Sequence, residues 1–203
     1  MTTGSDRPGA SAAEVHILFN GYANEGDTPS LSRVASTIAF VREGDVRVII
    51  DPGMVPDTSA MLEPLAALGE SPTTITDVIF SHHHPDHTLN AALFPRARFH
   101  DHMAIYQGDS WEDRPAEGYE ISPSIRLIET PGHTPQDITT LVGTRDGVYA
   151  FTHLWWSAEG PADDPFSTDV DALHRNRERV LQVATLIVPG HGAPFEPGES
   201  TPH

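Results

Sequence analysis

The chain contains a dense cluster of histidines at residues 81–87, which read Ser-His-His-His-Pro-Asp-His and fit the pattern His-x-His-x-Asp-His. A short apolar run, typical of a buried strand, comes directly before it. Side chains alternate along a strand, so a loop leaving its end can turn His82 and His84 toward one point. Asp86 and His87, beyond the bend, can then address a second point. Imidazole and carboxylate are ligands of Zn²⁺ and similar ions, so the cluster favours a metal site over a polar surface turn.

The composition is that of one globular domain. A chain of 203 residues and 22.1 kDa is long enough for a single core, and 38% hydrophobic with 20% charged residues is typical of such proteins. The first thirteen residues have neither a basic nor an apolar segment, so we expect no signal peptide. No apolar run is long enough to span a bilayer. The sequence therefore predicts a cytoplasmic protein without a membrane partner.

Two residue types are absent from the chain. It has no cysteine, which excludes disulfides, thiolate ligands and cysteine nucleophiles. All twelve basic residues are arginine, which excludes lysine Schiff-base chemistry. The formal net charge of −17 makes long nucleic acid an unfavourable partner, because polyanion binding needs a basic surface. Solubility is the alternative explanation of that charge.

The hydrophobic pattern predicts a strand-rich chain. Strands are expected over Glu14–Gly21, Ala35–Arg42, Val46–Asp51, Ile75–Phe80, Ala97–His100, Ile121–Glu129, Ile138–Gly143, Val148–Phe151 and Thr185–Val188. Helices are expected over Asp57–Gly69 and Asp169–Val183, with a helical turn over Met103–Gln107. Gly, Pro, Ser and Thr enrich both ends, so we expect disordered tails at 1–13 and 196–203 around one domain at 14–195.

Three more histidines follow apolar strands and begin loops. His133 lies in Thr-Pro-Gly-His-Thr-Pro, His153 follows the apolar run 148–151, and His191 lies in Pro-Gly-His-Gly. Loops at strand ends are where folds of alternating strands and helices place their chemistry. One histidine in such a place is more often structural than a ligand. Their recurrence downstream of the first cluster favours ligands.

These residues resemble the metallo-β-lactamase superfamily. The match extends from Asp51 in Ile-Ile-Asp-Pro-Gly through the histidine cluster to His133 and His191, in the same order. A closer resemblance, to the metallo-β-lactamase domain-containing protein 1 group, depends on segments 90–95, 175–180 and 188–195. The resemblance implies an α+β fold, an αββα sandwich of two mixed β-sheets with outer helices. It also implies a dinuclear metal site at one edge.

The resemblance assigns ligands to two metal ions. The first ion would be bound by His82, His84 and His133, and the second by Asp86, His87 and His191. Asp51 is expected to orient a ligand histidine by hydrogen bonding, although a turn-forming Asp before Pro-Gly is the alternative. The implied cofactor is Zn²⁺, one or two ions per chain, with Fe or Mn as alternatives.

One position departs from the superfamily's pattern. After the strand at 148–151, where the superfamily usually has Gly-Asp with a bridging carboxylate, this chain has Thr152-His153. A neutral imidazole offers one lone pair, so we expect His153 to ligate a single ion. The alternative is that His153 turns away and binds nothing. Asp86 and His153 are the residues expected to take part in catalysis.

The resulting prediction is an enzyme, a zinc-dependent hydrolase. A metal-bound hydroxide would attack a small ester, thioester, lactone or amide, and the ions would stabilise the oxyanion that develops. A phosphodiesterase or nuclease-type hydrolase is the first alternative, and a non-catalytic metal-bound domain that senses a ligand is the second. The expected partner is a small-molecule substrate, and a homodimer is compatible with the sequence.

Three segments are expected to form the walls of the substrate pocket: Ala23–Arg33, Asp109–Arg114 with Trp111, and Leu154–Phe166 with Trp155 and Trp156. Adjacent tryptophans after a ligand indicate an apolar substrate group. The alternative is that one ring packs in the core and the other covers a helix. Arg33, Arg114 and Arg175 could each hold a carboxylate or phosphate, and the sequence does not distinguish them from surface arginines.

Overall fold

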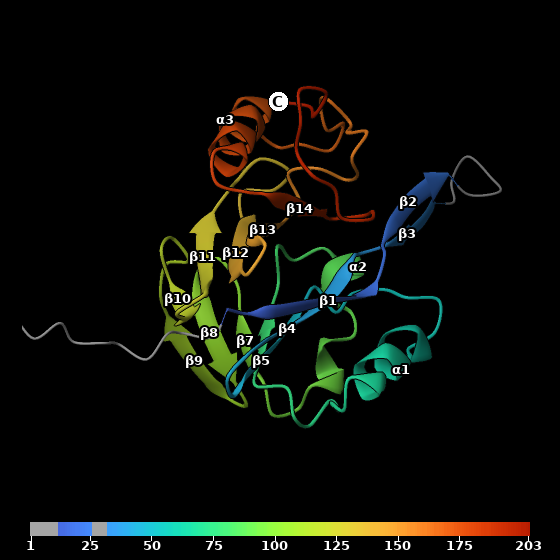
Figure 1. Cartoon of the computed structure of the whole chain (residues 1–203), viewed down its shortest axis with the longest axis vertical. Coiled ribbons are helices and arrows are strands. Elements are labelled where there is room, and N and C mark those ends of the chain that lie inside the picture. Colours follow the sequence, from blue (N-terminus) through green and yellow to red (C-terminus); the bar gives the residue numbers. More distant parts are fainter. Residues whose placement is uncertain (1–11, 26–31) are drawn as a thin grey trace, which may run out of the picture.

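Two mixed β-sheets form the centre of the computed structural model, which describes residues 12–25 and 32–203 (Figure 1). The larger sheet has the order β1 (Glu14–Phe19), β4 (Ile38–Glu43), β5 (Val46–Ile50), β6 (Asp77–Ile79), β7 (Arg98–His100), β8 (Ala104–Gln107) and β9 (Ser110–Asp113). The smaller sheet has the order β10 (Glu120–Ser122), β11 (Ile125–Glu129), β12 (Ile138–Thr144), β13 (Gly147–Thr152) and β14 (Leu186–Pro189). A separate hairpin of β2 (Tyr22–Glu25) and β3 (Ser32–Ala35) projects from the sandwich.

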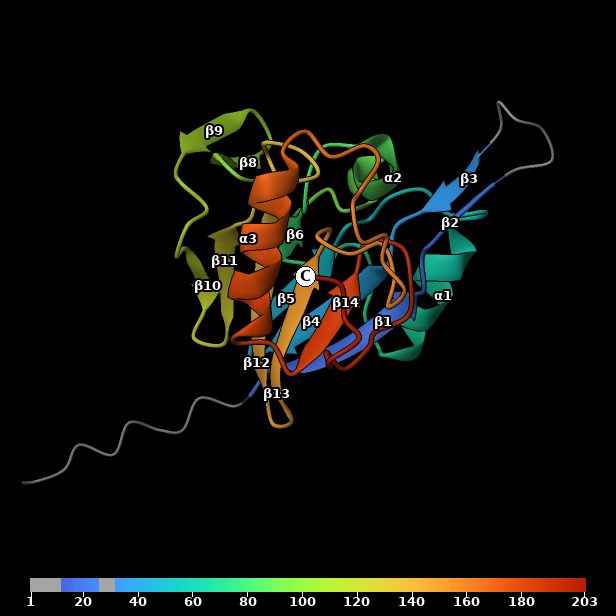
Figure 2. The ribbon, with the colours of Figure 1, turned by 90° about the horizontal axis from the view of Figure 1, so that it is seen from above.

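Helices cover the outer faces of the two sheets (Figure 2). Helix α1 (Ser59–Ala67) packs on the larger sheet and α3 (Val170–Leu181) on the smaller. Two short helices, α2 (Pro85–Thr88) and the 3₁₀ turn η1 (Ala91–Leu93), follow β6. Over the part of the chain that the structure describes, no helix combines the length and apolar character needed to cross a membrane.

Alternation along the strands explains the layered arrangement. In β4, Ala39 and Val41 lie in the core between the sheets, whereas Ile38 and Phe40 lie in the core under α1. Because successive side chains point to opposite faces, a strand that is apolar at every position must be covered on both sides. The second sheet is covered in the same way, by the first sheet and by α3. The predicted αββα sandwich is therefore confirmed.

The structure corrects the prediction for Met103–Gln107. This segment is not a helical turn, because residues 104–107 form strand β8, which pairs with both β7 and β9. Gly108, with a φ of +62°, makes the tight turn between β8 and β9. A four-residue run carries too little periodicity to distinguish strand from helix, and sheet pairing decides it.

The predicted strand over Ile121–Glu129 is two strands, β10 and β11, that form a hairpin. Its turn is held by the carboxylate of Glu43, which accepts hydrogen bonds from the hydroxyls of Ser122 and Ser124. Pro123, between these serines, cannot donate to a ladder, which is consistent with a turn there. The turn that separates β10 from β11 therefore depends on Glu43, which is distant in the sequence.

A buried arginine organises the loop that precedes α3. The guanidinium of Arg177, a fully buried side chain, donates to the carbonyl oxygens of Leu154 at 2.8 Å and Pro161 at 2.8 Å, and also to that of Ala162. It lies over the ring of Trp155, 5.5 Å from the centroid. These bonds tie the loop to α3 through carbonyls rather than through a carboxylate.

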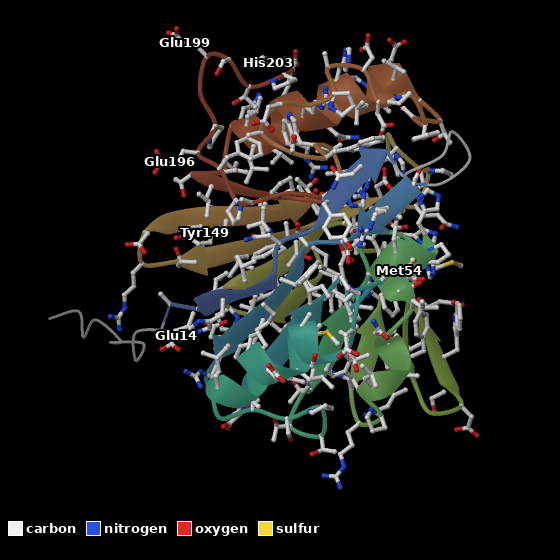
Figure 3. All side chains as sticks on the ribbon, turned by 90° about the vertical axis from the view of Figure 1, so that its right-hand side faces the viewer. Glu14, Met54, Tyr149, Glu196, Glu199 and His203 are labelled. Atoms are coloured by element: carbon white, nitrogen blue, oxygen red, sulfur yellow. The ribbon has the colours of Figure 1, made fainter. Side chains whose placement is uncertain are left out.

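The segment 196–203, predicted as a disordered tail, packs on the domain instead. The indole nitrogen of Trp155 donates to the carbonyl oxygen of Pro202 at 2.8 Å, and Thr201 is buried. His203, at the chain end, lies beside α3 (Figure 3). The small polar residues of this segment did not indicate packing, because its hydrogen bonds to the domain are made by backbone carbonyl oxygens. The predicted tail at 1–13 lies almost wholly outside the described residues.

Replacing Arg177 tests the importance of this buried guanidinium. Arg177→Leu should lower the free energy of unfolding by about 3 kcal/mol, because several buried carbonyls would lose their donor. Arg175→Leu, at an exposed position of the same helix, is the matched control and should change it by less than about 0.5 kcal/mol. Urea unfolding followed by circular dichroism measures both. Similar losses in the two variants would contradict this role.

Candidate metal centre

Five loops, each beginning at the carboxyl end of a strand, meet at one edge of the sandwich. Asp51 follows β5, the segment 81–87 follows β6, His133 comes after β11, His153 follows β13 and His191 follows β14. The pairs β5–β6 and β13–β14 are parallel, so the ends of each pair lie together. The fold therefore brings together histidines that are more than a hundred residues apart in the sequence.

The first predicted set of ligands is assembled. His82, His84 and His133 each place a ring nitrogen within 4.8 Å of the other two. The Nδ1 of His84 lies 2.9 Å from the Nε2 of His82 and 3.1 Å from the Nε2 of His133. Ligand atoms at the usual zinc–nitrogen distance lie roughly 2.9–3.4 Å apart around one ion. The three nitrogens therefore fit a common metal ion.

The second predicted set is also assembled. The Oδ2 of Asp86 lies 3.5 Å from the Nε2 of His87 and 3.6 Å from the Nε2 of His191. The Nε2 of His87 is buried and has no hydrogen-bond partner among the described residues, although buried imidazole nitrogens are normally paired. A divalent ion would satisfy this nitrogen, so these residues fit a second metal ion.

The carboxylate of Asp51 fixes the ring of His87. Its Oδ2 lies 2.8 Å from the Nδ1 of His87, and its Oδ1 accepts a hydrogen bond from the backbone N–H of Ser81 at 2.7 Å. With Nδ1 engaged in this way, the Nε2 of His87 is left to face the centre. Asp51 itself has a φ of +52°, a left-handed conformation that is uncommon for a residue with a side chain. It lies where sequence analysis expected a residue that orients a ligand.

Two further ligands are held by hydrogen bonds outside the centre. The Nδ1 of His133 lies 2.7 Å from the Oδ2 of Asp164, and the Nδ1 of His191 donates to the carbonyl oxygen of Ala35 at 3.0 Å. The same Oδ2 of Asp164 accepts from the indole nitrogen of Trp156 at 3.1 Å. Sequence analysis missed Asp164, because Pro-Ala-Asp-Asp-Pro resembles an ordinary polar loop. Its burial, visible only in the structure, distinguishes it from Asp163.

His153 lies between the two sets and does not turn away. Its ring centroid is 4.1 Å from that of His133 and 5.0 Å from that of His191. Its Nε2 is 3.0 Å from the Nε2 of His191, while its Nδ1 is buried and meets no hydrogen-bond partner in the described part of the chain. Gly190 makes room for this ring, because a Cβ there would lie 2.6 Å from the Cδ2 of His153. His153 therefore occupies the position where the resemblance places a bridging carboxylate.

Three histidines of the centre, His82, His153 and His191, have lowered pKa values that favour their neutral form. Burial holds the pKa of His82 and of His153 well below the usual value and lowers the pKa of His191 to about 4. Burial is the largest influence on His87 and acts in the same direction, but the charge and hydrogen bond of Asp51, together with the charges of Asp86 and Asp137, outweigh it and raise this pKa. A neutral imidazole has a free lone pair, so the lowered pKa values favour metal binding over protonation.

His83, the middle histidine of the cluster, faces away from the centre. Its Nε2 lies 2.9 Å from the Oδ2 of Asp101, which also accepts a hydrogen bond from the hydroxyl of Tyr106. Asp101 in turn accepts from the backbone N–H groups of Met103 and Ala104, both at 2.8 Å. Side chains alternate in direction along an extended segment, so His83 points outward. Its contact with Asp101 anchors residues 81–87, the metal loop, from the outer side.

A cavity of about 650 Å³ opens over both sets of residues. Trp156 lines it, as predicted, but the other two tryptophans do not. Trp155 is fully buried among the residues under α3. Trp111 lies on β9 at the far edge of the larger sheet, with its ring tilted against that of Tyr106. The segment Asp109–Arg114 likewise forms no part of the cavity wall.

Comparisons with known proteins agree with this geometry. The sequence matches the metallo-beta-lactamase superfamily over residues 31–193. It is 30% identical to metallo-beta-lactamase domain-containing protein 1 of Xenopus laevis, over 91% of this chain and 82% of that protein. A candidate metallo-beta-lactamase structure from Thermotoga maritima has a TM-score of 0.73 at 23% identity, covering 92% of this chain and 100% of that one. An N-acyl homoserine lactone hydrolase, with product at its catalytic metal centre, has a TM-score of 0.61 at 15% identity, covering 90% and 93%.

The role of Asp164 can be tested through metal affinity. Asp164→Ala should weaken zinc binding roughly 10–100-fold, because His133 would lose the hydrogen bond that orients its ring. Asp163→Ala is the matched control, since that side chain is 72% exposed and pairs with His174, outside the centre. Competition with a chromophoric chelator measures the affinities. Equal affinities in the two variants would show that Asp164 does not support the centre.

The role of His153 is separable from that of the other histidines. His153→Asp should keep or increase occupancy of the second ion, because a carboxylate can offer an oxygen to each of two cations. His153→Ala should lower the affinity for the second ion roughly 10–100-fold, as expected when a residue that holds the ion is lost. Metal analysis after reconstitution with Zn²⁺ measures both. Full metal content and full activity in the Ala variant would make His153 a structural residue.

Proposed function

The chain belongs to the metallo-β-lactamase superfamily, and on this basis we propose that it is a zinc-dependent hydrolase of a small ester, thioester, lactone or amide. One observation carries the proposal. Two adjacent sets of three side chains each bring their ligand atoms to separations that suit one metal ion. The choice of zinc follows from the ligand set, which is rich in imidazole and contains no thiolate.

Bound zinc would lower the pKa of a water molecule and stabilise negative charge on the attacked substrate atom. The chain's own residues supply the remaining requirements. Asp51 and Asp164 hold His87 and His133 in fixed orientations. The side chain of Asp86 is 15% exposed, and its Oδ2 lies beside the Nε2 atoms of His87 and His191. The other carboxylate oxygen is therefore available to accept a proton.

The cavity supports a small substrate. Its volume of about 650 Å³ lies within the range of ordinary small-molecule sites. Support for a lactone or ester comes from the lactone hydrolase of the same fold, whose product is bound at its metal centre. That protein shares the fold at 15% identity, so the substrate class is our proposal for this chain.

A phosphodiester is the second candidate substrate. The ligand sets contain a single carboxylate, that of Asp86, so bound divalent ions would keep most of their positive charge. This charge favours an anionic phosphoryl group over a neutral carbonyl. The net charge of −17 makes long nucleic acid unfavourable, so a small phosphodiester is the form we consider.

A substrate panel tests these proposals. Zinc-reconstituted protein should hydrolyse p-nitrophenyl acetate or a chromogenic lactone faster than bis-p-nitrophenyl phosphate. His84→Ala should lower kcat/KM at least about 100-fold through loss of a ligand, whereas the exposed His174→Ala serves as the matched control. Turnover of the phosphodiester alone would support the second candidate. Full zinc content without any turnover would contradict both candidates and favour a ligand-sensing domain.

A further inference from the structure

The projecting hairpin brings a positive charge to the cavity over the metal centre. Arg33 of β3 lines this cavity, and among the described residues that line it Arg33 is the sole arginine. Asn24 of β2 is its direct partner across the antiparallel ladder and lines the same cavity. Directly paired residues place their Cβ atoms about 4.5–5.5 Å apart on one face. A guanidinium and an amide, both hydrogen-bond donors, therefore lie side by side.

Among the described side chains of residues 12–24 and 32–203, none forms a hydrogen bond or ion pair with the side chain of Arg33 or Asn24. Arginine is the side chain best suited to carboxylate and phosphate, because its planar fork donates two parallel hydrogen bonds. The other two arginines that the sequence offered for this role are elsewhere. Arg114 donates to the carbonyl oxygen of Asp101, and Arg175 is exposed on α3.

Another part of the cavity wall is aromatic. Trp156 and Phe166 both line it, and their rings are stacked with centroids 5.8 Å apart and planes 9° from parallel. The hydrogen bond from Trp156 to Asp164 fixes the indole, whereas Phe166 is 69% exposed. A large apolar ring left this exposed at the rim of a cavity offers its surface to a flat apolar group.

We propose that this site takes an anionic substrate with a flat apolar group. The oxyanion binds Arg33 and Asn24, the apolar group packs against Phe166 and Trp156, and the scissile bond lies between them over the histidines. The position of the scissile bond rests on the proposed hydrolase function, but the two contacts with the ligand do not. The oxyanion is a carboxylate or a phosphate, which share the same recognition chemistry.

Direct binding of small probes to the zinc-reconstituted protein tests this proposal without a measurement of turnover. The probes are benzoate, phenyl phosphate and neutral benzamide, measured by isothermal titration calorimetry. Arg33→Gln should weaken the two anions about 10-fold and leave benzamide unchanged, as expected for the loss of a charge-assisted hydrogen bond. Arg126→Gln removes the same charge at an exposed position on β11 and is the matched control. Phe166→Ala should weaken all three probes about 3–10-fold.

The comparison of variants decides the outcome, because benzoate can also bind a metal ion directly. If Arg33→Gln and Arg126→Gln affect the anions equally, anion recognition by Arg33 is wrong. If Phe166→Ala leaves all probes unchanged, the aromatic contact is wrong. The anion that loses more affinity in Arg33→Gln identifies carboxylate or phosphate as the preferred group. If the Arg33 and Phe166 variants change probe binding as expected but the protein hydrolyses no ester, lactone or phosphodiester, the proposed hydrolase function is wrong. The proposed class of ligand would then still hold.

Discussion

The carboxylate of Asp51 is the interaction on which the arrangement of the centre depends. It joins the end of β5 to the loop after β6 through Ser81 and His87. The backbone nearby is packed so closely that a Cβ on Gly53 would lie 1.5 Å from the carbonyl oxygen of Asp86. That oxygen accepts hydrogen bonds from the N–H groups of Ser36 and Met54. The metal loop is thus held by its backbone and its side chains, which explains why a left-handed Asp51 is tolerated.

The centre concentrates groups that the protein alone does not satisfy. The Nε2 of His87 and the Nδ1 of His153 are buried, and no group in residues 12–25 or 32–203 forms a hydrogen bond with either. Such groups oppose folding unless something binds them, so metal binding and folding stability are linked in this chain. The outer hydrogen bonds to Asp51, Asp164 and the Ala35 carbonyl orient the rings before a metal ion arrives. The fold therefore provides the geometry, and the ion would provide the missing interactions.

Local pattern was sufficient to predict most of the strands and the histidines at strand ends, because period-two alternation and strand-end loops are local signals. The αββα sandwich and the two ligand sets were implied by the resemblance to the superfamily. Local pattern failed where distant contacts decide the outcome. Strand β8 depends on its neighbours in the sheet, and the backbone of residues 196–203 on Trp155. Trp155 and Trp156 are adjacent and chemically identical, yet only the fold shows which one faces the cavity. The sequence around Asp164 did not indicate that its carboxylate would orient His133.

The shared oxygen of Asp164 makes two events interdependent. Its Oδ2 meets both the Nδ1 of His133 and the indole nitrogen of Trp156. A molecule that shifts the indole changes the electron density available to the imidazole, and hence how strongly His133 can hold a cation. Thermodynamic reciprocity then requires the cation to change the affinity for that molecule by the same factor. Binding of a ligand at the aromatic wall and binding of a metal ion would therefore be coupled equilibria.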